Sequence, residues 1–155
     1  MNGEKMLRRS QIRENIFKLL FCKEFHEVED MDNQFELYLN DVEKLLGEEE
    51  TVFLMDKEVI TEKEKNEIID KVNAVIAKTA MIDDKLNEAS VGWKTNRMGK
   101  VELTILRLAY YEMMFDDDVP KKVAIDEAVE LAKKYGSDMA PSFVNGVLAK
   151  VYVEE

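Results

Sequence analysis

The sequence predicts an all-α protein of about seven helices. Its 155 residues include only six glycines and two prolines, so few positions interrupt regular structure. Apolar residues recur three or four positions apart along most of the chain, and no stretch alternates as a half-buried strand would. A hydrophobic content of 46% favours a folded core over disorder. Because the length is that of about one domain, we expect residues 1–155 to form a single helical domain.

The first predicted helix, Lys5–Phe21, combines an apolar face with a local excess of positive charge. Residues 1–23 hold six basic and two acidic residues, a net charge of +4 in a chain whose net charge is −11. The helical period puts four apolar residues on one face that we expect to be buried: Ile12, Ile16, Leu19 and Leu20. Arginines lie toward its start and phenylalanines toward its end: Arg8, Arg9, Arg13, Phe17 and Phe21. The charge pattern alone leaves open whether this start is merely solvated or binds an anion.

The middle of the chain predicts three further elements. After a polar break at 26–33, a second helix is indicated by Phe35, Tyr38, Val42, Leu45 and Leu46. Residues 51–60 fit either a helical turn or a loop. The run Thr61–Glu64 matches a capping box, which predicts a third helix from here to about Thr79. A shorter helix follows from about Asp83 to Val91, with Gly92 as its expected stop.

The last third of the chain predicts three helices joined by short loops. Val101–Phe115 is the most apolar and is expected at the centre of the bundle, ending at Asp116–Asp118. The next helix should reach Tyr135 and end at Gly136. Pro141 suits the first turn of the last helix. Within that helix, Gly146 predicts close approach by a neighbouring helix, because a glycine there costs about 1 kcal/mol relative to alanine.

The composition disfavours several classes of function. A single Cys22 makes no internal disulfide, and with a single His26 it makes a structural zinc site improbable. No glycine-rich phosphate loop is present, and the acidic runs lack the spacing of a calcium loop. We therefore expect a binding protein with no cofactor rather than an enzyme.

The charge and hydropathy of the chain also bear on its partners and its compartment in the cell. An acidic body would repel a polyanion over most of its surface, so any contact with nucleic acid should be local and sensitive to salt. No apolar run approaches the roughly 18 residues of a membrane span, and the start lacks a signal-peptide core. We expect a cytoplasmic protein without a membrane partner.

Four blocks of residues, in this order, resemble the NusB family of bacterial transcription antitermination and ribosomal RNA processing factors. The blocks are Arg8–Glu14, Val101–Met113, Val119–Tyr135 and Phe143–Leu148. The stretch from Glu24 to Thr95 matches only in its helical pattern. The resemblance implies a NusB-like fold of two packed three-helix bundles.

The resemblance also implies partners and site residues. NusB-like proteins bind the boxA element of nascent RNA together with the ribosomal protein NusE, in a complex with other Nus factors that keeps RNA polymerase elongating. Carried over by position, the implied RNA contacts are Lys5, Arg8, Arg9, Arg13, Lys121, Lys122 and Phe143. The apolar pattern leaves Phe143 open to stacking on a base or to packing in the core. The implied contacts with the protein partner are Phe21, where the family often has tyrosine, and Glu102.

The sequence is also compatible with other interpretations. A protein-interaction adaptor of the same fold, with little RNA affinity, would use the acidic helices and not the arginines. A domain attached to a ribosomal RNA cytosine methyltransferase is disfavoured, since we expect no nucleotide-binding domain beyond Glu155. A homodimer, which would cover the partner surface, is also compatible with the sequence.

Overall fold

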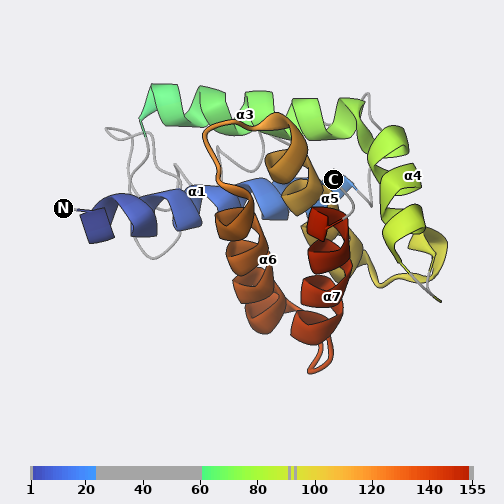
Figure 1. The fold of residues 1–155 in the computed structure, drawn as a ribbon. Helices are drawn as coiled ribbons and strands as arrows, with labels where there is room; N and C mark the ends of the chain where they lie inside the picture. The colour runs from blue at the N-terminus through green and yellow to red at the C-terminus, as the bar shows by residue number, and fades with distance from the viewer. Residues whose placement is uncertain (1, 24–60, 91, 93, 154–155) are drawn as a thin grey trace. The chain divides into compact units, whose positions relative to one another are not determined.

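The all-α fold is confirmed by a computed structural model, which describes residues 2–23, 61–90, 92 and 94–153, without the side chains of 2–8. Across these ranges the chain forms six α-helices and one 3-10 turn, with no strand (Figure 1). The bounds are α1 Asn2–Lys23, α3 Glu62–Ala77, α4 Thr79–Ala89, η2 Thr95–Arg97, α5 Lys100–Phe115, α6 Lys121–Tyr135 and α7 Ala140–Val153. The helix expected around Phe35–Leu46 and the segment 51–60 lie outside the described residues. The chain divides into two compact units, 1–74 and 75–155.

In the first unit, α1 buries most of the face that the sequence predicts. Ile16, Leu19 and Leu20 are buried, whereas Ile12 is half-buried. Phe17 is also buried, so the apolar stripe of α1 is wider than the predicted one. Burying a side chain of this kind contributes about 1.5–3 kcal/mol to folding.

The predicted capping box at the start of α3 is confirmed. The Thr61 backbone N–H donates to Glu64 Oε1 at 2.9 Å, and the Glu64 N–H donates to Thr61 Oγ1 at 3.1 Å. These two bonds satisfy donors that a helix start otherwise leaves unpaired. The following turns bury Ile68 and Val72, as their helical spacing predicts.

In the second unit, α5 lies at the centre of a bundle, as expected. It packs against α4, α6 and α7, and α6 packs along α7 in the opposite direction (Figure 1). Nine of its sixteen residues are buried: Leu103, Thr104, Ile105, Leu106, Leu108, Ala109, Tyr110, Glu112 and Met113. Glu112 is fully buried and has polar partners, because no buried side-chain N or O atom in the described residues lacks one.

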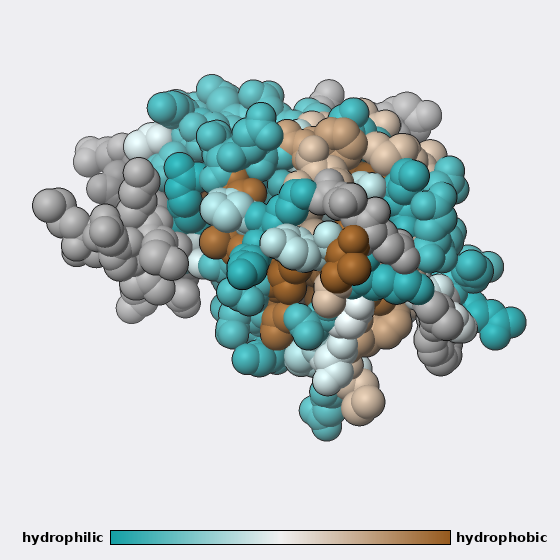
Figure 2. Space-filling view, in the orientation of Figure 1, coloured by the Kyte–Doolittle hydropathy of each residue, from teal (hydrophilic) through white to brown (hydrophobic). Residues whose placement is uncertain are grey.

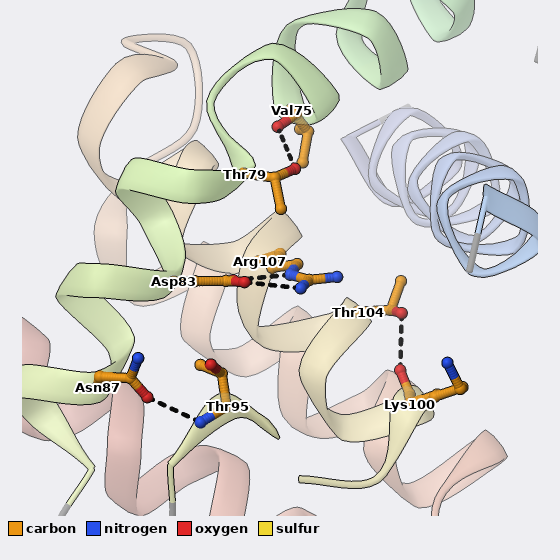
Figure 3. A network of polar contacts seen from close by, with 8 residues as sticks. All are labelled: Val75, Thr79, Asp83, Asn87, Thr95, Lys100, Thr104 and Arg107. Carbon is orange, nitrogen blue, oxygen red and sulfur yellow. Dashed lines mark hydrogen bonds and ion pairs between the residues drawn. The ribbon is translucent and has the colours of Figure 1, made fainter. Parts of the chain in front are cut away.

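A polar clamp joins α4 to α5 within this bundle (Figure 3). The Arg107 guanidinium donates to both carboxylate oxygens of Asp83, at 2.8 and 2.7 Å. Nearby, the Thr95 backbone N–H donates to Asn87 Oδ1 at 2.7 Å, which ties η2 to the end of α4. The two bonds of the clamp fix the register of α4 on α5, because the planar guanidinium can donate to both oxygens of a carboxylate in only a few orientations.

The helix ends follow the predicted loops with two differences. α5 ends at Phe115, and the Asp118 backbone N–H donates to Asp116 Oδ1 at 3.0 Å in the short turn before α6. α6 ends at Tyr135 with Gly136 as its C-cap, as expected. α4, however, begins at Thr79 and not near Asp83, because only one residue separates it from the end of α3 at Ala77. It also ends at Ala89, before Gly92, which has a φ of 89° in the following segment.

The expectation for Gly146 is wrong. A Cβ built on Gly146 meets nothing within 4 Å, so no neighbouring helix of the described chain approaches it. Gly136 has the close contacts instead, since its Cβ would lie 2.5 Å from Ala140 Cβ and 2.9 Å from the Ala132 carbonyl oxygen. The glycine that packing requires is therefore at the end of α6 and not within α7.

Candidate RNA and partner surfaces

The arginines of α1 differ in their exposure. Arg9 is exposed, whereas Arg13 is only 7% exposed and has contacts within the chain. The side chains of Lys5 and Arg8 lie outside the described residues. Because an arginine that binds RNA must present its guanidinium to solvent, Arg9 meets this condition and Arg13 does so poorly.

Phe21, the expected contact with a protein partner, lies at the other end of α1. It is half-buried, and its ring stacks on that of Phe17, with centroids 6.1 Å apart and an interplanar angle of 29°. Because Phe17 is itself buried, it supports the Phe21 ring from the core side. Phe21 therefore combines a fixed ring with some accessible apolar surface. Next to it, burial raises the pKa of the Cys22 thiol.

Lys121 and Lys122 form the first turn of α6. Lys122 is exposed and Lys121 is half-buried. No side chain caps this helix start, because Pro120 stands at the N-cap. Helix starts carry unpaired N–H groups and a partial positive charge, which together with two ammonium groups favour an anion such as a phosphate.

Phe143 lies in the first turn of α7, at the opposite end of α6 from the two lysines. It is half-buried, and its backbone N–H donates to the Met139 carbonyl oxygen at 3.1 Å. Its neighbour Val144 is fully buried. Because α6 has 15 residues and rises 1.5 Å per residue, about 22 Å separate its two ends. The structure therefore does not bring Phe143 and the lysines Lys121 and Lys122 together.

Glu102 lies at the same end of the bundle as Phe143. It is half-buried in the first turn of α5. Its Oε1 is 3.5 Å from the position of a Cβ built on Gly136, in the turn between α6 and α7. In the second unit, an expected protein contact and an expected RNA contact thus share one end, and the lysines occupy the other.

The surface over α6 and α7 mixes hydrophilic and hydrophobic areas (Figure 2). Large apolar side chains are exposed near both ends of these helices: Val123, Met139, Tyr152 and Val153. Phe115, at the end of α5, is also exposed, and Lys78 Nζ lies 4.5 Å from its ring centroid. Within the described ranges, no group of three or more His, Cys, Asp or Glu residues could hold a metal ion. The helices found there also include none long and apolar enough to cross a membrane.

The fold and these surfaces define an all-helical protein whose candidate binding residues lie along α1 and near the ends of α5, α6 and α7. Residues 10–153 match the model of the NusB family, and the chain belongs to that family. It is 51% identical over 142 residues to the transcription antitermination protein NusB of Agathobacter rectalis, covering 92% of this chain and 97% of that protein. It is 48% identical to the protein of the same name from Lachnoclostridium phytofermentans, again covering 92% and 97%.

Solved structures agree with this family assignment. NusB of T. maritima superposes with a TM-score of 0.72 at 33% identity, covering 95% of this chain and 92% of that one. NusB in a crystal structure with NusE and double-stranded RNA superposes with a TM-score of 0.75, covering 97% and 99%. At 22% identity, this second likeness is evidence for the shared fold alone.

Proposed function

We propose that this chain is an RNA-binding transcription antitermination factor that binds boxA RNA together with the ribosomal protein NusE and acts on elongating RNA polymerase with other Nus factors. The observation that carries this proposal is the NusB family match over residues 10–153. The 51% identical relative is named for the same function. The proposal includes no catalytic step, and it puts the chain in the cytoplasm, where bacterial transcripts are made.

For RNA, the proposal relies first on the first half of α1. Arg9 is exposed there, and the resemblance assigns the neighbouring Lys5 and Arg8 to the same contact. A guanidinium offers several N–H donors in a rigid plane, which suits phosphates and base edges. Lys121 and Lys122 would add a second, separate contact with phosphates. Phe143 would stack on a base through the part of the residue that remains accessible.

For the protein partner, the proposal assigns Phe21 and Glu102. Phe21 supplies apolar contact through a ring that is supported by Phe17. Glu102 supplies a carboxylate for a basic group of NusE. Since Phe21 lacks the hydroxyl of the tyrosine frequent in the family, any hydrogen bond from that position is absent in this chain.

The proposal is tested by measuring the affinity of boxA RNA for the complex with NusE at two salt concentrations. Arg9→Ala should weaken RNA binding. It should also make the slope of log K against log salt concentration shallower by about 0.7, the value for one phosphate contact on a single strand. The matched control is Arg97→Ala, which removes another exposed arginine from η2, outside every assigned contact.

Two outcomes would count against this assignment. Equal losses for Arg9→Ala and Arg97→Ala would mean that only net charge matters and that Arg9 is not a specific contact. Unchanged RNA affinity in the double variant Arg8→Ala with Arg9→Ala would mean that the arginine assignment is wrong. Absence of RNA binding by the parent chain, with NusE binding retained, would favour the adaptor interpretation.

A further inference from the structure

Two glycines surround the carboxylate of Glu102. Gly99 is the N-cap of α5, three residues before Glu102, and a Cβ built on Gly99 would collide with Glu102 Oε2. A Cβ on Gly136, at the end of α6, would lie 3.5 Å from Glu102 Oε1. The side chain therefore folds back over the start of its own helix and points toward the turn between α6 and α7.

The backbone at Gly99 does not itself require glycine. Its φ of −59° and ψ of 148° lie in a region open to every L-residue. What an alanine would change is the space, because its methyl group would occupy the position of the Glu102 carboxylate oxygen. The carboxylate is flexible enough to swing away, so the substitution would redirect Glu102 without disrupting the backbone.

The position of the carboxylate is favourable in the free chain. A negative group near a helix start interacts with the partial positive charge of the unpaired N–H groups, typically by a few tenths to 1 kcal/mol. Because Gly99 has no side chain, it cannot cap α5, and no side-chain hydrogen bond caps that helix. The room left by Gly99 is thus occupied by the one acidic side chain of the first turn of α5.

We infer that Gly99 is a positioning residue for the protein partner: it keeps open the space that directs the Glu102 carboxylate toward the α6–α7 turn. The inference rests on the proposed function, in which Glu102 contacts NusE. The group that meets this carboxylate would be a lysine or arginine side chain, because a half-buried carboxylate at an interface needs a positive or hydrogen-bonding counterpart.

Gly136 is not suited to testing this inference. Its Cβ would lie 2.9 Å from the Ala132 carbonyl oxygen and 2.5 Å from Ala140 Cβ, so an alanine there would shift the backbone of the turn. Gly146 provides the matched control, since a Cβ there meets nothing within 4 Å. The comparison of Gly99→Ala with Gly146→Ala therefore separates the effect on Glu102 from the general effect of an added methyl group.

The experiment is a double-mutant cycle with Gly99→Ala, Glu102→Ala and the combined variant, measured on the full chain. The first readout is affinity for NusE. Gly99→Ala should weaken binding about as much as Glu102→Ala, about tenfold for one hydrogen bond to a charged group, and the combined variant should be no weaker than Glu102→Ala alone. Gly146→Ala should bind NusE as the parent chain does. If the combined variant lost NusE affinity by the product of the two single fold-losses, the inference would be overturned. It would also be overturned if Gly99→Ala bound NusE as tightly as the parent chain.

The second readout separates failure of the inference from failure of the proposed function. In urea unfolding of the chain without partners, Gly99→Ala should lower the midpoint more when Glu102 is present than when residue 102 is alanine. Alanine also stabilises a helix less than glycine does at an N-cap, but this difference in stability is the same with Glu102 and with alanine at position 102. Comparing the two midpoint shifts therefore cancels it. Absence of binding by the parent chain would refute the NusE proposal. Equal midpoint shifts in the two backgrounds would refute the positioning role of Gly99.

Discussion

The Asp83–Arg107 clamp gives a prediction whose size follows from its geometry. Replacing Arg107 with alanine removes two charge-assisted hydrogen bonds, at 2.8 and 2.7 Å, and leaves the Asp83 carboxylate without this partner. The side chains are only 14% and 22% exposed, so water replaces little of the lost interaction. Breaking a fully buried pair costs about 3–5 kcal/mol, and with this residual exposure we expect Arg107→Ala to lower the free energy of unfolding by about 2–4 kcal/mol.

The assay is urea unfolding followed by circular dichroism, with Lys133→Ala as the control. Lys133 pairs with Glu130 at 3.2 Å on the surface of α6, with side chains 59% and 66% exposed. Such a pair is typically worth less than about 1 kcal/mol, so its loss should be close to the error of the measurement. In the combined variant Asp83→Ala with Arg107→Ala, the free energy of unfolding should fall by less than the sum of the two single losses. Neither variant residue then leaves a buried charge without its partner. A loss for Arg107→Ala no larger than that of the control would refute this reasoning.

Three further predictions concern stability and titration. Gly146→Ala should raise the free energy of unfolding by about 0.5–1 kcal/mol in a urea titration, because the added methyl group meets nothing and alanine favours a helix; a loss would contradict this. Arg13→Ala should cost about 1–3 kcal/mol, because the residue is buried with contacts, whereas Arg9→Ala should change stability by less than about 0.5 kcal/mol. Burial raises the pKa of the Cys22 thiol, so its thiolate fraction at pH 8 is lower in the folded chain. Alkylation by iodoacetamide should therefore be slower than in urea, and an equal rate would count against burial.

A pH effect follows from Tyr110 in the same way. Burial, and secondarily the negative charge of Glu88, raises the pKa of the Tyr110 phenol in the folded chain. The unfolded chain therefore loses this proton first as the pH rises, so the stability contributed by the protonated phenol is lost as the pH passes about 10 and upward. Thermal unfolding between pH 8 and 11, compared with Tyr110→Phe, checks the sign. A parent chain that gains stability relative to the variant over this range would contradict it.

The elements that the sequence predicts well are those with local signals. The capping box at Thr61–Glu64 and the glycine at the end of α6 are each confirmed, because both depend on residues a few positions apart. The apolar period also predicts α5 as the centre of its bundle. The NusB-like fold follows from four sequence blocks, and the family match confirms it.

The features that sequence reasoning missed depend on contacts between distant residues. Asp83 and Arg107 are 24 positions apart, and nothing local indicates that they pair. Arg9 and Arg13 occupy successive turns of one helix, yet only Arg9 is exposed, because packing around α1 and not spacing decides exposure. Gly146 is unusual because glycine destabilises a helix interior, and the sequence shows this much. The sequence does not show whether any other element approaches Gly146, and in the structure none does within 4 Å of a built Cβ. The candidate RNA and NusE contacts stay predictions.

The length of α6 has a consequence for the RNA itself. With about 22 Å between the Lys121–Lys122 end and the Phe143 end, no single nucleotide can reach both. If both ends bind RNA, their contributions come from different positions along the strand. A series of progressively shorter oligonucleotides should then lose affinity in separate steps, with the lysine step sensitive to salt and the Phe143 step nearly insensitive. The helix would in this way set the minimum number of nucleotides that the second unit can recognise.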